Sequence, residues 1–229
     1  MFNNFQYAYL IGNFFFLFVW IILFLYRRDL RKEMLTMSLL VAPLGFTQVF
    51  YFQDYWRPDY FWKPIISMVG IEDILFSFSI GGIAAVIYEE FFGKKYTKRH
   101  LQSRIWWMFG FVVLSIVFMA IGRLIFKINF MYLSILFSLF IGVLIIILRH
   151  DLLMDALFSG LLIGGLMFIF YLVFGQLFDG IIQKWWMLKN ISGILIFGTP
   201  LEELMWGFSW GFVAGPTYEF IKGLRFKKF

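Results

Sequence analysis

Long apolar runs recur along almost the whole chain, and they restrict the fold more than any other feature. Of the 229 residues, 62% are hydrophobic, and the mean hydropathy is +0.82. Runs of about 20 mostly apolar residues are typical of helices that cross a bilayer. The sequence therefore predicts an all-α membrane protein with seven transmembrane helices. They are expected near residues 6–26, 35–53, 66–88, 105–126, 129–148, 153–176 and 192–220.

The last apolar run is too long for one straight helix. Pro200 lies inside it, and a proline in a helix interior removes a backbone hydrogen bond. We therefore expect a short re-entrant or interfacial piece over 190–198, followed by the true seventh helix from Pro200.

The basic residues predict the orientation of these helices. One set of alternate connections carries Arg27, Arg28, Arg31, Lys32, Lys94, Lys95, Lys98, Arg99, Arg104, Arg149, Lys222, Arg225, Lys227 and Lys228. The other set carries Arg57, Lys63, Arg123, Lys127, Lys184 and Lys189. The side with more Lys and Arg faces the cytoplasm, which predicts an outside N-terminus and a cytoplasmic C-terminus in a multi-pass protein of the cell membrane. This topology also accounts for the net charge of +6, so no nucleic-acid partner is expected.

The residue types exclude several kinds of site. There is no cysteine, so disulfides, thiolate catalysis and Cys-based metal sites are excluded. The two histidines, His100 and His150, fall in predicted cytoplasmic connections and are far apart in sequence. We expect no metal site and no cofactor.

An internal repeat divides the chain. The segment "GIEDILFSFSIGGIAAVIYEEFFG" at 70–93 aligns without gaps with "PLEELMWGFSWGFVAGPTYEFIKG" at 200–223, and "RRDLRKEML" at 27–35 resembles "RHDLLMDAL" at 149–157. The predicted organisation is one membrane domain, 1–229, with repeat one over 6–93, a bridging helix over 105–126 and repeat two over 129–223. The fifth predicted helix comes four membrane crossings after the first, so the two helices cross the membrane in the same direction and the two three-helix repeats are parallel. A site is expected at the interface between the repeats.

Two pairs of acids lie at equivalent positions of the repeats. Glu72 aligns with Glu202, and Asp73 aligns with Glu203. Acids inside membrane spans usually face a protein interior or cavity and are functional. Adjacent helical residues point about 100° apart, so one glutamate of a pair can face a cavity while the other pairs with Arg123 or a backbone donor. The predicted catalytic residues are Glu202, Glu203, Glu72 and Asp73, and the predicted supporting residues are Arg123 and Asp54.

Glu202 also has a structural explanation. "TPLE" fits a capping box in which Thr199 is the N-cap, Pro200 is the first helical residue and Glu202 reaches back to the cap. This interpretation does not explain Glu203 or the acid pair in repeat one.

Aromatic residues follow the acids at helical spacing. Trp206 and Trp210 lie four and eight residues after Glu202, and Phe76 takes the place of Trp206 in repeat one. Aromatic faces attract cations, so we expect Trp206, Trp210 and Phe76 to line a substrate pocket. Ordinary helix packing is the alternative explanation of the same stripe.

The motif "PLEELMW", its twin "GIEDILF" and the three-helix repeat resemble the integral-membrane lycopene cyclase domain family. The resemblance covers nearly the whole chain, although the first copy has Gly-Ile-Glu-Asp where Pro-Leu-Glu-Glu would match better. It implies ring closure at the ends of a linear carotenoid, with the acidic motif at Glu202, Glu203, Glu72 and Asp73. An acid protonates the terminal double bond, the carbocation attacks the next one, and a proton is lost, without net redox. A carboxyl in apolar surroundings holds its proton at neutral pH, as such general acid catalysis requires.

Other functions fit the sequence less well. A Glu-Glu intramembrane metalloprotease would need an Arg where Gly207 stands and histidines within the membrane spans. A retinal protein would need a lysine in the seventh helix, and none occurs between Lys189 and Lys222. A flavin-dependent cyclase would need a Gly-rich turn between a strand and a helix. The remaining alternative is a non-catalytic protein that binds a carotenoid or other polyisoprenoid lipid, or a membrane scaffold. A homo-oligomer is left open.

Overall fold

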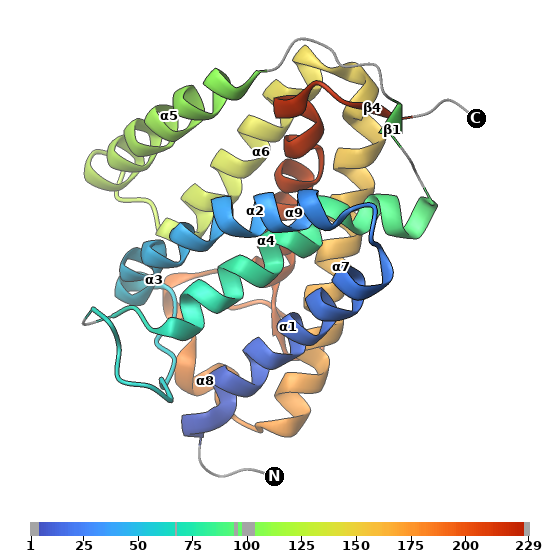
Figure 1. Ribbon diagram of the computed structural model, residues 1–229. Coiled ribbons are helices and arrows are strands. Elements are labelled where there is room, and N and C mark those ends of the chain that lie inside the picture. Colours follow the sequence, from blue (N-terminus) through green and yellow to red (C-terminus); the bar gives the residue numbers. More distant parts are fainter. Residues whose placement is uncertain (1–4, 67, 94–95, 98–103, 227–229) are drawn as a thin grey trace.

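The structure is a computed structural model that describes residues 5–66, 68–93, 96–97 and 104–226. It is built from helices, with two short antiparallel strand pairs (Figure 1). The α-helices are α1 (Ala8–Tyr26), α2 (Arg31–Val41), α3 (Gln48–Asp54), α4 (Ile71–Phe92), α5 (Ile105–Leu124), α6 (Phe130–Leu148), α7 (Leu153–Leu177), α8 (Ile181–Trp185) and α9 (Leu201–Lys222). The 3₁₀ helices are η1 (Phe5–Tyr7), η2 (Ala42–Thr47), η3 (His150–Leu152) and η4 (Leu188–Asn190). Strand β1 (Tyr96–Thr97) pairs with β4 (Arg225–Phe226), and β2 (Leu195–Ile196) pairs with β3 (Thr199–Pro200).

Six stretches of the described chain are long and apolar enough to cross a membrane. They are Phe5–Tyr26, Arg31–Asp54, Ile71–Phe92, Ile105–Leu124, Phe130–Leu148 and His150–Leu177. The predicted seventh span, α9, has 22 residues but is less apolar, and it packs against α4, α6 and α7 (Figure 1). Because these neighbours cover much of its surface, α9 tolerates polar residues that lipid would not. The protein is an all-α membrane protein.

The helix boundaries differ from the sequence prediction in the first half of the chain. The helix predicted over 35–53 begins at Arg31 and tightens into η2, which contains Pro43. The helix predicted over 66–88 is α4, which follows Gly70 in extended backbone and ends at Gly93 with φ +59°. That left-handed conformation favours glycine and ends the helix. Apolarity alone placed this helix too early along the chain.

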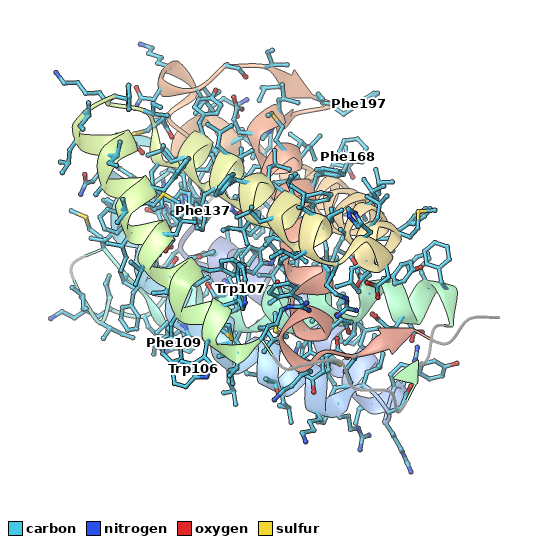
Figure 2. The ribbon with its side chains drawn as sticks, turned by 90° about the horizontal axis from the view of Figure 1, so that it is seen from above. Trp106, Trp107, Phe109, Phe137, Phe168 and Phe197 are labelled. Carbon is cyan, nitrogen blue, oxygen red and sulfur yellow. The ribbon has the colours of Figure 1, made fainter. Side chains whose placement is uncertain are left out.

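The piece predicted to be re-entrant or interfacial over 190–198 starts at the end of η4 and leads into the β2–β3 hairpin, which spans residues 195–200. Phe197 and Gly198 form its turn, with φ values of +49° and +84°. A turn with two positive φ values suits the twist of a tight hairpin. The Phe197 side chain is 84% exposed, and its ring centroid lies 6.2 Å from that of Phe168 on α7 (Figure 2).

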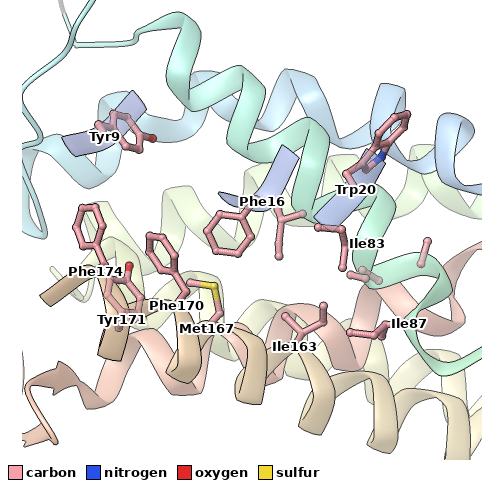
Figure 3. Close-up of a cluster of buried hydrophobic side chains, with 14 of the residues drawn as sticks. Tyr9, Phe16, Trp20, Ile83, Ile87, Ile163, Met167, Phe170, Tyr171 and Phe174 are labelled. Atoms are coloured by element: carbon pink, nitrogen blue, oxygen red, sulfur yellow. The ribbon is translucent and has the colours of Figure 1, made fainter. Parts of the chain in front are cut away.

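The main core lies between the helices of the two predicted repeats. Figure 3 shows Phe16 of α1 facing Phe170 of α7, and their ring centroids are 4.7 Å apart. By contrast, α5 lies along the side of the bundle beside α6, and its Trp106 and Phe109 point outward (Figures 1 and 2). Such an apolar outer surface is what a bilayer solvates.

The two ends of the bundle are named here after the predicted orientation. The outer end is where α4 and α9 begin, and the inner end is where they finish. At the inner end, Arg27 binds Asp29 through two nitrogens and donates to the backbone carbonyl of Glu89 at 3.1 Å. Arg149 binds Asp151 in the same way and donates to the carbonyl of Glu219 at 3.5 Å. Aligned residues of the two predicted repeats thus make the same contacts.

Close helix contacts also recur at aligned positions, with large and small residues exchanged. A Cβ on Gly82 of α4 would lie 2.4 Å from Nε1 of Trp20 on α1. In the repeat alignment, Gly82 corresponds to Phe212 of α9, and Trp20 corresponds to Gly142 of α6. A Cβ on Gly142 would lie 2.4 Å from the Phe212 ring. Each contact therefore joins one bulky residue to one glycine, so neither glycine position has room for a side chain.

Candidate functional site

The acids of repeat one lie at the start of α4, at the outer end. Glu72 and Asp73 are 0% and 3% exposed. Glu72 accepts hydrogen bonds from the backbone N–H groups of Phe61 and Trp62, at 3.0 and 3.3 Å. Asp73 accepts from the Tyr9 hydroxyl at 2.6 Å on one oxygen. Its other oxygen accepts from the Tyr60 hydroxyl at 3.0 Å and from the Gly70 N–H at 2.7 Å.

The acids of repeat two lie at the start of α9 and are equally buried. Glu202 accepts from the Tyr132 hydroxyl at 2.7 Å and from the Ser192 N–H at 2.8 Å, both on Oε1. Glu203 accepts from the Tyr55 hydroxyl at 2.7 Å and from Trp186 Nε1 at 2.8 Å. Tyr55 follows α3, so its hydrogen bond ties the first predicted repeat to the second.

The two pairs share one pattern of hydrogen bonding. The first acid of each pair accepts from a backbone N–H of the loop that precedes its helix. The second acid accepts from phenol or indole groups. Oε2 of Glu72 and Oε2 of Glu202 are buried and have no hydrogen-bond partner within the described ranges. Each pair therefore combines an anchored acid with an acid that keeps one carboxyl oxygen available.

Aromatic rings connect the two pairs across the outer end. Tyr9, which binds Asp73, packs edge-on against Trp56 with centroids 5.1 Å apart. Trp56 lies 5.2 Å from Trp186, which binds Glu203. Rigid rings of this kind fix the positions of the groups that they bind.

The predicted aromatic stripe lies below the acids, towards the inner end. Phe76 of α4 and Trp206 of α9 are 5.8 Å apart between ring centroids. Trp206 stacks in parallel on Trp210, with centroids 6.0 Å apart and planes 5° from parallel. The three residues predicted to line a pocket are thus brought together, on the two helices that carry the acids.

The predicted capping box at Thr199 is wrong. Pro200 is the N-cap of α9, no side chain caps the helix, and the Thr199 hydroxyl has no hydrogen-bond partner in the described chain. Pairing of β3 with β2 draws Thr199 into the hairpin, and Glu202 turns to Tyr132 and Ser192 instead. Asp73 makes the equivalent cap at the start of α4, by accepting from the Gly70 N–H.

The predicted supporting residues bind each other. Arg123 of α5 forms an ion pair with Asp54 of α3, and within the described part of the chain neither binds an acid of the two pairs. The backbone carbonyl of Asp54 accepts from Asn129 and Asn190 at 2.9 and 3.1 Å. This group joins α3, α5, α6 and η4 at the outer end, and so it holds the frame around the site.

Two of the phenols lie in loops outside the spans. Burial raises the pKa of Tyr55 well above its ordinary value, and the charge of Glu203 adds to the shift. Burial and the charge of Asp73 likewise raise the pKa of Tyr60. Both phenols therefore stay protonated at physiological pH and act as permanent donors to the acids.

Sequence reasoning missed the residues that hold the acids. They are Tyr9, Tyr55, Tyr60, Tyr132 and Trp186. All lie near predicted span ends, where Tyr and Trp are common in any membrane protein. Their type and position therefore did not distinguish them from interfacial aromatic residues.

An apolar groove lies between α6 and α9. Its volume is about 280 Å³, and it is lined by Ile135 and Leu139 of α6 and by Leu204, Met205 and Phe208 of α9. Tyr132 lies one turn before Ile135, and Glu202 lies two residues before Leu204. The groove therefore runs along the two helices whose outer ends carry the Tyr132–Glu202 hydrogen bond.

The fold and site define an integral-membrane helical protein with two buried carboxyl pairs set among aromatic residues. The model of the lycopene cyclase family matches residues 6–92 and 129–221. The chain belongs to the lycopene cyclase family, as the acidic motif and its twin predicted. Its function is carotenoid cyclase-like. It is a membrane protein of carotenoid biosynthesis that contains a lycopene cyclase domain. Comparison with curated proteins and with solved structures gave no significant match.

Proposed function

We propose that the protein is an isomerase that closes rings at the linear ends of a lycopene-type carotenoid by acid catalysis. The observation that carries this proposal is the pair of buried carboxyl groups repeated at the start of α4 and α9, in a chain of the lycopene cyclase family. A buried acid in an apolar, water-poor site can hold and transfer a proton to a double bond.

Glu202 is our candidate for the proton donor. Its Oε1 is fixed by Tyr132 and Ser192, and its Oε2 is the oxygen without a partner. Oε2 gives a proton to the terminal double bond, the carbocation attacks the next double bond, and a ring carbon returns a proton to the carboxylate. Atoms and electrons balance, so the reaction is an isomerisation that needs no external oxidant or reductant.

The remaining site residues take positioning and electrostatic roles. Glu203 is held as an acceptor by Tyr55 and Trp186, and the faces of Trp206 and Trp210 stabilise the cation. In repeat one, Glu72 is the counterpart of Glu202, Asp73 of Glu203 and Phe76 of Trp206.

The proposed architecture has seven spans in two parallel repeats joined by α5, with the N-terminus outside and the C-terminus cytoplasmic, in the cell membrane. The matching Arg27 and Arg149 contacts and the exchanged glycine contacts support the repeats. The orientation depends in part on Lys94, Lys95, Lys98, Arg99, Lys227 and Lys228, which lie outside the described residues.

The test is expression in a bacterium that accumulates lycopene, followed by extraction and chromatography of the pigments. Cyclised carotenoid should appear with the wild-type chain. Unchanged lycopene in cells with the protein well expressed in their membranes would rule out cyclisation of that substrate. Full activity in both Glu202→Gln and Glu203→Gln would remove the acids from the mechanism.

A non-catalytic carotenoid or polyisoprenoid binder is the second candidate. The groove along α6 and α9 favours it, because all five residues that line the groove are apolar. A binder would co-purify with unmodified carotenoid, and enlarging Leu204 to Phe would lower the pigment per protein. A cyclase would instead release product with new rings, so the same extraction distinguishes the two.

A further inference from the structure

The two predicted repeats differ at the place where repeat two has its apolar groove. In the repeat alignment, α6 corresponds to α1, and α9 corresponds to α4. The groove between α6 and α9 therefore corresponds to the contact between α1 and α4. The side chains at these two places decide which half of the chain has room for a ligand.

In repeat one, an indole fills this place. Trp20 of α1 is 8% exposed, and its ring centroid lies 5.2 Å from that of Phe78 on α4. The indole Nε1 donates to the Ser38 hydroxyl oxygen of α2 at 2.9 Å, which fixes the ring between the helices. A ligand could lie against Phe78 only if the Trp20 ring left this position.

In repeat two, the same place has no indole. The counterpart of Trp20 is Gly142, and the counterpart of Phe78 is Phe208. Phe208 stacks on Phe212 of its own helix, with centroids 5.9 Å apart, and lines the groove. The exchange of tryptophan for glycine on the first helix thus leaves Phe208 without the ring that covers Phe78.

The groove begins one helical turn from the acid that we propose as the proton donor. Met205 follows Glu202 by three residues on α9, so the two lie on neighbouring positions of one helix face. Ile135 follows Tyr132 in the same way on α6, and the Tyr132 hydroxyl binds Glu202 at 2.7 Å. Glu202 is 1% exposed, and its Oε2 has no hydrogen-bond partner in the described chain. That oxygen is therefore available to a ligand in the groove.

The size and chemistry of the groove favour one occupant. All five lining residues are apolar, and the volume of about 280 Å³ is slightly below the range of about 300–1,000 Å³ for ordinary ligand pockets. The groove therefore has room for one end of a long polyene, while the rest of the molecule stays in the bilayer. A lipid acyl chain has no use for a nearby acid, whereas the terminal double bond of a polyene can accept its proton.

We propose that the groove binds one linear end of a carotenoid from the bilayer, and that ring closure takes place in repeat two alone. This inference rests on the proposed function. Each binding event adds one proton to the bound end and removes one from it, so the product has the same formula, one new ring and an unchanged second end. A second ring requires release of the molecule and binding of its other end. The carotenoid with one ring is therefore a free intermediate.

The binding test uses the full-length chain with Glu202→Gln, in lipid nanodiscs, so that bound lycopene is not consumed. Lycopene has no chiral centre, so a visible circular dichroism band reports molecules held by the protein and not those dissolved in lipid. We expect the band to saturate at one lycopene per chain. Leu139→Phe and Met205→Phe, added to this parent, each place a ring in the groove and should weaken binding about tenfold.

Leu136→Phe is the matched control, because Leu136 of α6 is 51% exposed and is not part of the groove lining. Its binding should equal that of the parent. Met205 is 41% exposed, so its enlargement leaves the core unchanged even if Leu139→Phe fails to fold. Absence of the band, saturation at two lycopenes per chain, or equal binding by the parent and the groove variants would overturn the proposal.

The activity test follows the pigments over time with the wild-type chain and an excess of lycopene. The product with one ring should appear first and accumulate while lycopene remains. Product with two rings, formed from the start without that intermediate, would overturn the proposal. A chain that binds lycopene as expected but forms no ring would refute the proposed cyclisation while supporting the groove as a binding site.

Discussion

Replacing Glu202 with Gln separates the two roles that the structure suggests for the paired acids. Glutamine has the same shape as glutamate, and its carbonyl can still accept from Tyr132 and Ser192, whose donors lie 2.7 and 2.8 Å from Oε1. The variant therefore keeps the anchored oxygen and loses only the proton at the other position. General acid catalysis contributes about 100- to 10,000-fold to a rate, or about 2.7–5.5 kcal/mol of barrier.

Glu203→Gln is the matched comparison. Its carbonyl keeps the hydrogen bonds from Tyr55 and Trp186, and under our assignment the variant loses no transferred proton. We expect its rate to fall by less than about tenfold, against at least about 100-fold for Glu202→Gln.

The assay is the fraction of lycopene cyclised over time, by chromatography, in membranes that contain equal amounts of each variant. The reasoning would be refuted if Glu202→Gln kept more than about a tenth of the wild-type rate. It would also be refuted if Glu203→Gln were the more damaging change, because the anchored acid would then be the donor.

Three further predictions concern stability and ionisation. Tyr55→Phe removes the hydroxyl that binds Glu203, so the melting temperature in detergent should fall by about 3–8 °C for a loss of about 1.5–2 kcal/mol. An unchanged value would show that the remaining donors satisfy the acid. Phe212→Ala opens a void beside Gly142 and should lower the free energy of unfolding by about 3–5 kcal/mol, measured by denaturant titration. A loss below about 1 kcal/mol would mean that the helices close the gap. The pKa values of Tyr55 and Tyr60 are higher in the folded protein than in the unfolded chain, where the tyrosine pKa is about 10. The two phenols therefore stabilise the folded state fully below about pH 10, and this stabilisation is lost as the pH rises through their pKa values in the folded protein. Up to about pH 11, Tyr55→Phe and Tyr60→Phe should therefore show the same tyrosinate absorbance at 295 nm as the wild-type protein. A smaller absorbance in either variant would mean that the replaced tyrosine ionises below that pH, which would contradict its raised pKa.

The sequence was informative where a local rule decides the outcome. Helices follow from apolar length, and Pro200 lies directly before α9 because a helix start tolerates a residue without an N–H. The match between Glu72–Asp73 and Glu202–Glu203 indicated the family, since paired acids at aligned helix starts are rare in apolar segments. These conclusions need only neighbours in the chain.

The sequence was misleading where two segments compete for one group. The capping box at Thr199 was a sound local interpretation, but β2 pairs with β3 and the Glu202 carboxylate finds a phenol on α6. A local sequence pattern cannot predict that Glu202 binds Tyr132, which is 70 residues away in the chain. The same reason hid the convergence of Glu33, Glu89 and Glu219, whose carboxylate oxygens lie within 4.8 Å of one another at the inner end.

The sequence by itself determined that this chain is a helical membrane protein of the lycopene cyclase family with two aligned acid pairs. Apolar length, charge and the repeated motif are properties of the chain read in order, so folding is not needed to see them. Only the tertiary structure decided which carboxyl oxygens are bound and which are left without a partner. That difference depends on phenols and loop amides brought together from distant segments. Hydrogen bonding acts over about 3 Å in space regardless of separation in sequence.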